Sequence, residues 1–448
     1  MRLMLLYTNG QQLSIFKVAV EGKHRSKRYQ FKMQTTIQAS DPKIFSLNYM
    51  RQLRFTLETI GQWPNRTLGD FSRRAILLSI YHKFLIGTFC ITEVLAFLYM
   101  RKHRKTIRFI DMGQIYTNLF LTGLFLQRAS LPFQKNYKEC VKKFVFEFHL
   151  MHHEHISAFA LKESSKVNTI CKIATKVIYL QLACGMLAYN LSPLFRNYYE
   201  GMFASELPEN KSFVHSVDYL LPFDAYRSFT GYLVVFTWNW FPTYNIPTAM
   251  GIYDLLVFVM VFHMVGHMNI LYNSLQEFPK PKEGQSDALP TRAYNEEIFG
   301  LLKNVIRHYQ MIKEFMGDMT AAFDLTLCCY LAFHQVMCCL MLLECSTLEP
   351  EALVKYGLLA AVIFQQLIQT SVAFELIKSK SDSLGDEVYA VPWEYMDVKN
   401  RRILLLFLRN VQDPLGLKAC GMVPVGVLTM STIIRTSFSY YLMLATFD

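Results

Sequence analysis

A long, nearly charge-free stretch at the end of the sequence constrains the fold of this chain most. Between Ala419 and Phe447 the single charged residue is Arg435. Because a bilayer crossing needs about 20 mostly apolar residues, this stretch predicts a membrane-spanning helix that brings Asp448 to the far face of a membrane. Its many small and hydroxyl side chains suit a helix that packs against other helices or faces water. They are Gly421, Gly426, Thr429, Ser431, Thr432, Thr436, Ser437 and Ser439.

Six further apolar runs have the length of a span, and hydrophobic residues make up 52% of the chain. The sequence therefore predicts an all-α, polytopic membrane protein with seven transmembrane helices. The expected spans are Ala75–Met100, Phe109–Gln127, Ile173–Ser192, Thr248–Tyr272, Ala321–Glu344, Val354–Ile377 and Ala419–Leu444. The expected domains are a cytoplasmic segment (1–74), a six-span bundle (75–377), a cytoplasmic anchor region (378–417) and the seventh helix (418–448).

The basic residues predict the orientation of the spans. Lys and Arg are about fourfold more frequent in one set of connecting segments than in the other, which places the N-terminus in the cytoplasm and the C-terminus outside. The basic run Arg101–Arg108 lies on the outer side and opposes this assignment. The start of the chain shows no signal peptide, so we expect the first span to direct insertion.

The net charge of +11 resides in segments that flank apolar runs, so anionic lipid explains it better than nucleic acid. The ten cysteines lie mostly in apolar segments without metal-ligand spacing, where Cys acts as a small hydrophobic residue.

Asn210, in the long outer loop, is the expected glycosylation acceptor, whereas Asn190 is too near the membrane.

Three cytoplasmic segments show helical amphipathic periodicity: 136–172, 295–319 and 395–411. We expect them to continue the spans into the cytoplasm and to pack together there. The first carries His149, His152, Glu154 and two further histidines, but no third metal ligand is evident, so a solvated helix face is the favoured interpretation. Without a catalytic motif or a nucleotide-binding loop, the sequence predicts neither an enzyme nor a cofactor.

The outer halves of the spans are rich in aromatic and Met residues, which together predict a pocket for a small lipophilic ligand. Ordinary bundle packing is the alternative for any one of them. The candidates are Tyr116, Phe120, Met186, Tyr189, Met250, Tyr253, Phe333, His334, Met337 and Tyr356. Four carboxylates in or near the spans, Glu93, Asp254, Asp324 and Glu344, suit either ion coupling in a transporter or hydrogen-bonded packing, and we favour packing.

Several motifs resemble those of the insect odorant receptor family over nearly the whole chain. They include Ile60-Gly61-Gln62-Trp63-Pro64 near the N-terminus, Val261–Leu275 in the fourth span with His267 where Gln is more usual, and a C-terminal block. That block comprises Val388-Tyr389, Pro392-Trp393, Asn400-Arg401-Arg402, Gln412, Pro414, Leu417-Lys418-Ala419, Gly421-Met422 and Thr436–Tyr441. The run Pro424–Met430 is similar to that of the moth pheromone-receptor branch.

The resemblance implies an odour-tuning subunit of a ligand-gated, non-selective cation channel in the plasma membrane of olfactory neurons. Such subunits form tetramers with a co-receptor, bind volatile apolar ligands, and line a central pore with the seventh helix. The long fourth-to-fifth insertion of the co-receptor is missing here, which indicates the tuning subunit. Carried over, the pore and gate residues are Thr429, Thr436, Tyr440, Met443 and Phe447. The last two are four residues apart and share a helix face.

Three other functions remain as alternatives. A gustatory-receptor-type channel would differ in its terminal motif and in its independence of the co-receptor. A G-protein-coupled receptor would have the opposite orientation and carry D-R-Y and N-P-x-x-Y patterns, and a transporter would show internal repeats.

Overall fold

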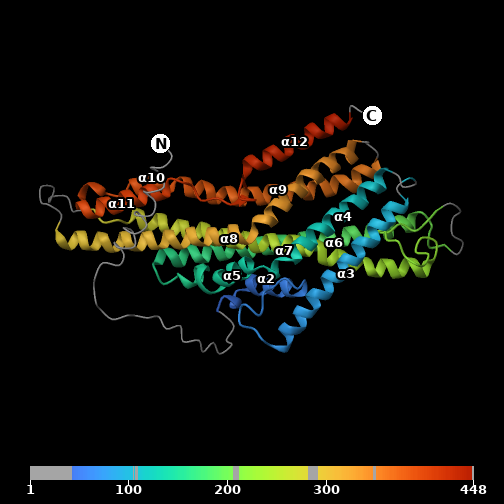
Figure 1. Cartoon of the computed structure of the whole chain (residues 1–448), viewed down its shortest axis with the longest axis horizontal. Coiled ribbons are helices and arrows are strands. Elements are labelled where there is room, and N and C mark those ends of the chain that lie inside the picture. Colours follow the sequence, from blue (N-terminus) through green and yellow to red (C-terminus); the bar gives the residue numbers. More distant parts are fainter. Residues whose placement is uncertain are drawn as a thin grey trace, which may run out of the picture. The chain divides into compact units, whose positions relative to one another are not determined.

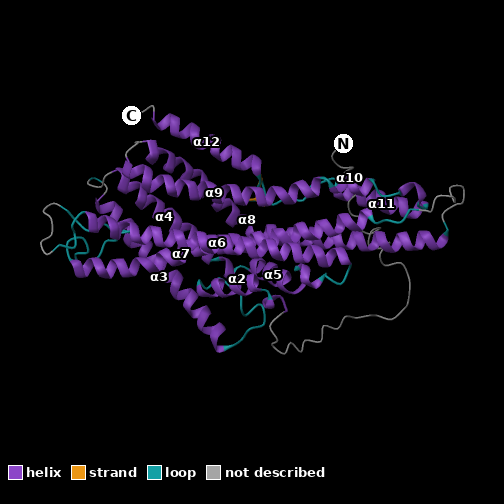
Figure 2. Ribbon diagram, turned by 180° about the vertical axis from the view of Figure 1, so that it is seen from behind, coloured by secondary structure: helices purple, strands orange, loops and turns teal. Residues whose placement is uncertain are grey.

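The computed structural model describes residues 43–103, 105, 109–204, 211–280, 291–346 and 350–445, all within one compact unit, Asp41–Asp448. Figure 2 shows these residues almost entirely as helix, with one pair of short strands among them. The predicted all-α class is therefore confirmed.

Seven helices coincide with the seven predicted spans (Figure 1). They are α3 (Arg73–His103), α4 (Phe109–Ala129), α6 (Ala158–Tyr199), α7 (Phe229–Gln276), α8 (Arg292–Ser346), α9 (Pro350–Asp382) and α12 (Val427–Ala445). By length and composition, α3, α6, α7, α8 and α9 can each cross a membrane, while α4 and α12 are shorter. The remaining helices are α2 (Asn48–Thr59), α5 (Lys135–Lys143), α10 (Leu384–Tyr389) and α11 (Val398–Val411), and single turns cover Lys43–Ser46, Leu131–Phe133, Phe144–Phe148, Leu150–His152 and Trp393–Tyr395.

Helix α7 lies at the centre of the bundle and contacts α4, α6, α8 and α9. In its most apolar segment 78% of the residues are buried, against 17% in α3 and α6. A helix that is apolar on every side is stable only where other helices surround it, whereas α3 and α6 leave apolar faces for lipid. Helix α8 has 55 residues, far more than a bilayer needs, which agrees with the predicted cytoplasmic extension through 295–319.

The prediction of one continuous helix over 136–172 is wrong. Helix α5 ends at Lys143, one π-helical turn follows at Phe144–Phe148, and α6 begins only at Ala158. Side chains at the break replace the missing helical hydrogen bonds. The Nδ1 atom of His149 accepts a hydrogen bond from the Met151 amide (3.2 Å), and the Ser157 hydroxyl accepts one from the Ala160 amide (3.0 Å).

His149 lies in the core, so the predicted solvated histidine face is wrong at this residue. Its side chain is fully buried, and burial lowers its pKa to about 3, so the ring is neutral at pH 7. Because Nδ1 already accepts a hydrogen bond, the hydrogen of the neutral ring is on Nε2, which donates to the Tyr49 hydroxyl (2.8 Å).

The Tyr49 hydroxyl is the centre of a fully satisfied polar junction between α2, α6, α7 and the segment before α6. His263 also has an occupied Nδ1, which accepts from the Leu150 amide (3.3 Å), so its Nε2 donates to Tyr49 (3.1 Å). The hydroxyl in turn donates to Asn168 Oδ1 (3.0 Å). One phenol thus accepts two hydrogen bonds and donates one, which is its full capacity.

Helix α12 begins eight residues later than the predicted start of its span at Ala419. The intervening chain forms an antiparallel pair of strands, β1 (Lys418–Ala419) and β2 (Val423–Pro424). The turn between them places Cys420 (φ 51°) and Gly421 (φ 65°) in the left-handed region. Because a run of helical residues cannot include this conformation, the chain turns back on itself before α12 starts.

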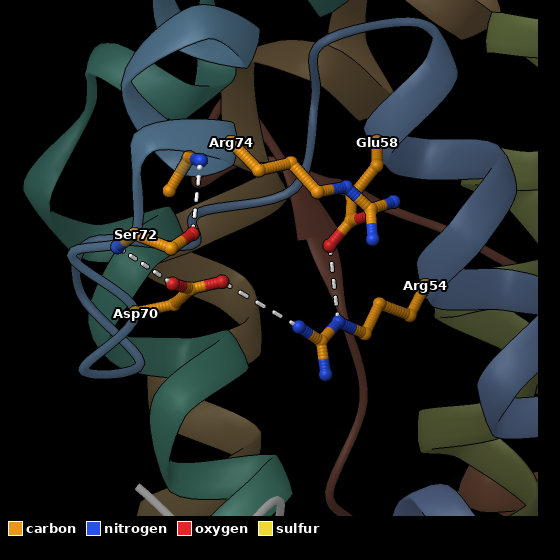
Figure 3. A network of polar contacts seen from close by, with 6 residues as sticks. Arg54, Glu58, Asp70, Ser72 and Arg74 are labelled. Atoms are coloured by element: carbon orange, nitrogen blue, oxygen red, sulfur yellow. Dashed lines mark hydrogen bonds and ion pairs between the residues drawn. The ribbon is translucent and has the colours of Figure 1, made fainter.

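A polar network fixes the connection from α2 to α3 (Figure 3). Arg54 pairs with Glu58 (3.0 Å) and with Asp70 (3.7 Å). Asp70 accepts a hydrogen bond from the Ser72 amide (3.0 Å), and the Ser72 hydroxyl accepts one from the Ala75 amide (3.2 Å). Ser72 thereby caps the first turn of α3.

Replacing Tyr49 with Phe is expected to destabilise the protein. The change removes the acceptor of two buried histidine N–H groups and the donor to Asn168, and each buried polar group left unpaired costs about 1–3 kcal/mol. The matched control is Tyr253→Phe, because the buried Tyr253 hydroxyl makes no hydrogen bond to the described part of the protein. The thermal midpoint of the purified protein in detergent should fall clearly for Tyr49→Phe and little for Tyr253→Phe. Equal midpoints for the two variants would contradict the junction.

Candidate ligand pocket and pore helix

A buried apolar cluster lies where α4, α7, α8 and α9 meet. Its members are Leu124, Met250, Phe333, Met337, Cys338, Met341, Tyr356 and Ile363. Four of the ten predicted ligand residues belong to it: Met250, Phe333, Met337 and Tyr356. Three methionines belong to the cluster, and their flexible side chains would allow it to change shape around a ligand.

His334, another predicted ligand residue, lies beside this cluster on α8. Its side chain is fully buried, and its ring packs on those of Tyr330 (centroids 4.1 Å apart) and Phe333 (5.3 Å). The Nδ1 atom is 2.9 Å from the Tyr330 carbonyl oxygen one turn back on the same helix. The cluster is therefore mainly apolar, with the Tyr356 hydroxyl among its members and one imidazole at its edge.

Arg128 lies one turn along α4 from the cluster residue Leu124 and is 1% exposed. Its guanidinium forms an ion pair with Asp254 of α7 (2.8 Å) and donates to the Met250 carbonyl (2.6 Å). The rings of Tyr253 and Tyr330 lie 5.4 Å and 5.6 Å from the guanidinium carbon. A charge buried among helices is stable only when it is paired in this way, so α4 and α7 are locked together directly beside the cluster.

A cavity of about 20 Å³ adjoins this ion pair and is lined in part by Arg128, Tyr253, Asp254, Tyr330 and Thr370. Its size suits one water molecule. The Arg128 Nε atom and the Tyr253 hydroxyl are both buried and form no hydrogen bond within the described residues. A water molecule in the cavity could therefore serve polar groups that no side chain reaches.

The other predicted ligand residues lie elsewhere. Tyr253 belongs to the surroundings of Arg128. On α6, the Tyr189 hydroxyl contacts Asn118 Oδ1 (2.8 Å) and the Ser216 carbonyl (2.8 Å), and Met186 is one turn away and half-buried. Tyr116 and Phe120 are 38% and 43% exposed. They line a groove between α3 and α4 together with Glu93, Val94, Phe97, Met100 and Leu119.

Two of the four carboxylates singled out in the sequence, Asp254 and Asp324, make the packing contacts of the favoured interpretation. Asp254 pairs with Arg128, as described above. The Asp324 carboxylate on α8 accepts a hydrogen bond from the Gly421 amide in the turn before α12 (2.9 Å). Glu375 on α9, which sequence analysis did not single out, accepts one from the Val427 amide at the start of α12 (3.1 Å). A carboxylate at a helix N-terminus also stabilises the helix dipole.

Gln335 of α8 makes the main polar contact with α12, and sequence analysis missed it. Its Oε1 atom accepts a hydrogen bond from the Thr436 hydroxyl (2.7 Å), and its Nε2 atom donates to the Ser437 hydroxyl (3.0 Å). Ser437 is fully buried. Gln335 follows His334 directly, so consecutive residues of α8 turn toward the cluster and toward α12.

The predicted pore residues occupy one face of α12. Thr429 and Thr436 are half-buried, while Tyr440 and Met443 are 52% and 50% exposed. Phe447 lies outside the described residues. Arg435 is exposed on another side of α12, and Ser439, one turn before Met443, is exposed as well.

The two sequons on the predicted outer side, at Asn190 and Asn210, have different outcomes. Asn210 lies outside the described residues. Asn190 is fully buried, with its side-chain amide bonded to the Met186 carbonyl (3.0 Å), so it cannot accept a glycan in this fold.

Comparison with known proteins gives consistent results. A sequence profile of the family described as 7tm Odorant receptor matches residues 134–438, well over half of the chain. Odorant receptor 67a of Drosophila melanogaster is 24% identical over 216 residues, which cover 46% of this chain and 51% of that protein. Odorant receptor Or2 of Anopheles gambiae is 21% identical over 148 residues, covering 33% and 39%. The matches thus span about half or less of these curated relatives.

The fold also matches a solved structure. The insect olfactory receptor OR5 from Machilis hrabei, determined in complex with eugenol, superposes with a TM-score of 0.65 at 12% sequence identity. The match covers 89% of this chain and 98% of that one. At this identity the likeness establishes the shared seven-helix membrane fold alone.

Breaking the buried ion pair from one side is expected to destabilise the bundle strongly. In Asp254→Asn the Arg128 charge stays buried without its counter-charge, which costs about 3–5 kcal/mol. In the double variant Arg128→Met/Asp254→Leu no charge remains, so much of this loss should be recovered. The exposed pair Arg292–Glu296 provides the control, because Glu296→Gln should change stability by less than about 1 kcal/mol. Thermal midpoints and surface delivery measure the effect, and a double variant less stable than Asp254→Asn would refute this interpretation.

Proposed function

This chain belongs to the 7tm odorant receptor family, a family of sensory receptors rather than enzymes, and we propose that it is an odour-tuning subunit of a ligand-gated, non-selective cation channel. It is a multi-pass membrane protein by its helices and its family. In the proposal it acts in the plasma membrane of olfactory neurons, together with co-receptor subunits, and α12 lines the shared pore.

The observation that carries this proposal is the double role of α8. One face of α8 supplies Phe333, Met337 and other residues of the apolar cluster, and the adjacent Gln335 is hydrogen-bonded to α12. A ligand that spreads the cluster must displace side chains of α8, and any shift of α8 acts on α12 through a direct contact. This arrangement provides a short physical route from a binding site to a pore helix.

The apolar cluster supports a small lipophilic ligand. It offers flexible methionines, aromatic walls and few polar groups, which is the usual composition of such sites. The structurally similar OR5 from Machilis hrabei was solved in complex with eugenol, a small lipophilic molecule. The run Pro424–Met430 favours the pheromone-receptor branch within the family, which is compatible with a ligand of this kind.

The face of α12 with Thr429, Tyr440 and Met443 is proposed to border the pore. The opposite choice would place Arg435 in the pore, where a ring of guanidinium groups would repel permeant cations. Hydroxyl groups and apolar side chains on the proposed face suit a passage that is closed by dewetting and opens when it widens. Arg435 would then meet a neighbouring helix or lipid headgroups.

Gating requires the ligand to bind the open state more tightly than the closed state. A preference of about 100-fold supplies roughly 2.7 kcal/mol per binding site. Burial of about three more CH₂ groups of the ligand in the open state than in the closed state would supply this preference, since each buried CH₂ group contributes about 0.8 kcal/mol.

Co-expression of this chain with an odorant co-receptor is expected to give cation currents evoked by lipophilic odorants. Cysteines placed at Tyr440 and Met443 should make these currents sensitive to a cationic methanethiosulfonate reagent applied from outside. A cysteine at Phe438, which is 48% exposed on another face of α12, should not. The parent chain serves as the control for its native cysteines. Absence of current despite surface delivery would contradict the channel function, and block at Phe438 alone would contradict the proposed pore face.

A further inference from the structure

We infer that His334 accepts a hydrogen bond from the ligand, and that the preferred ligands of this receptor are lipophilic molecules that carry a hydroxyl group. This inference rests on the proposed function and names the ligand class of the same site. It follows from the hydrogen bond at one nitrogen of a buried ring and from the lack of a hydrogen bond at the other within the described residues.

The hydrogen bond of Nδ1 fixes the state of the ring. The partner of Nδ1 is the Tyr330 carbonyl oxygen, which can only accept, so Nδ1 carries the hydrogen. A fully buried imidazole without a counter-charge is neutral, because burying its charged form is costly. In the neutral ring, Nε2 therefore carries a lone pair and no hydrogen.

That lone pair makes no hydrogen bond with the described part of the protein. Nδ1 lies against the backbone of α8, so Nε2 on the far side of the ring points away from its own helix. The backbone carbonyl of Ile363, a member of the apolar cluster on α9, lies beside the ring on this side; a carbonyl can only accept, so it supplies no hydrogen to Nε2. Nε2 therefore lies at the border between α8 and α9, at the edge of the cluster.

Nearby polar side chains do not supply a donor. The Tyr330 hydroxyl, which packs beside His334, is already paired with the Thr370 hydroxyl (2.9 Å). The guanidinium of Arg128 is engaged with Asp254 and with the Met250 carbonyl. A buried acceptor without a donor costs about 1–3 kcal/mol, so a ligand that brings a donor removes this cost as it binds.

The chemistry of Nε2 selects among ligands of one shape. An alcohol or a phenol can donate its O–H to the lone pair. Ethers, esters, aldehydes and ketones have oxygen lone pairs only, so they would leave Nε2 unpaired and bury a second acceptor beside it. A carboxylate would bring an unpaired charge into an apolar site. The three methionines of the cluster can adapt to the hydrocarbon part of the ligand, whatever its shape.

The test compares each hydroxyl compound with its methyl ether. The probe pairs are eugenol and methyl eugenol, octanol and methyl octyl ether, and dodecanol and methyl dodecyl ether. Three receptors are compared: the natural chain, His334→Phe, which keeps an aromatic ring but has no acceptor, and His334→Gln, whose side-chain oxygen can still accept. Each is co-expressed with a co-receptor, and the concentration for half-maximal current is measured for each pair.

The natural chain should require about tenfold more ether than alcohol within the pairs that activate it, which corresponds to one satisfied buried hydrogen bond. His334→Gln should retain most of this preference. In His334→Phe the ratio should approach one, because the ether gains and the alcohol loses relative to the natural chain. An unchanged ratio in His334→Phe, or a natural chain that responds equally to ethers, would overturn the inference.

A second measurement separates this inference from the channel function. The purified receptor in detergent is heated with each probe, and the ligand-induced rise of its thermal midpoint reports binding without any current. Greater stabilisation by alcohols that is lost in His334→Phe, without evoked current, would support the ligand class and contradict the channel function. Current without an alcohol preference in either measurement would support the channel function and contradict the ligand class. Failure of His334→Phe to fold would be evident from its thermal midpoint without ligand. In that case His334→Gln is compared with His334→Asn, whose shorter side chain should lose the preference for alcohols.

Discussion

The hydrogen bonds between Gln335 of α8 and the hydroxyl groups of Thr436 and Ser437 connect the last helix to the rest of the bundle. Most of α12 is exposed in the single chain, and its main contacts are with α8 and α9. Two carboxylates, Asp324 and Glu375, fix the turn before it and its first amide. Since α8 supplies both Gln335 and much of the apolar cluster, the proposed binding site and the proposed pore helix share one rigid element.

The polar groups inside the bundle divide the molecule into a fixed part and an adaptable part. Toward the predicted cytoplasmic side, the Tyr49 junction and the pair of Arg128 and Asp254 hold α2, α4, α6 and α7 with directional bonds. Beyond Arg128, the cluster between α4 and α9 is held by apolar contacts and methionines, which impose little geometry. His334 is the polar exception at its edge. A ligand that enters the cluster would need space, and the helices held by directional bonds would resist displacement. The ligand would therefore displace α8 and α9.

The sequence allowed the helices to be located, because long apolar runs and periodic faces decide where helices form. It did not reveal the break at His149, because no Pro or Gly marks it. Hydrogen bonds from His149 to Tyr49 and from the Leu150 amide to His263, both partners far away in the chain, make it favourable. The strands before α12 were missed, although Gly421 was a signal for a turn.

For the site, composition identified the types of residue but not which helix faces meet. Met250 and Phe333 meet in one cluster, whereas Tyr116 and Phe120 face outward. Gln335 and Ser437 are likewise hydrogen-bonded only because the fold brings their helices together, which the sequence does not show.

A double-mutant cycle on Gln335 and Ser437 tests most directly whether ligand binding acts on α12 through α8. The half-maximal ligand concentration and the maximal current are measured for Gln335→Ala, Ser437→Ala and the double variant, with Thr432→Ala on the exposed surface of α12 as the control. If the contact transmits the signal, each single change impairs activation, and the double variant is no worse than the stronger single one, a coupling of about 0.5–3 kcal/mol. Additive effects, or no effect beyond that of Thr432→Ala, would contradict this account.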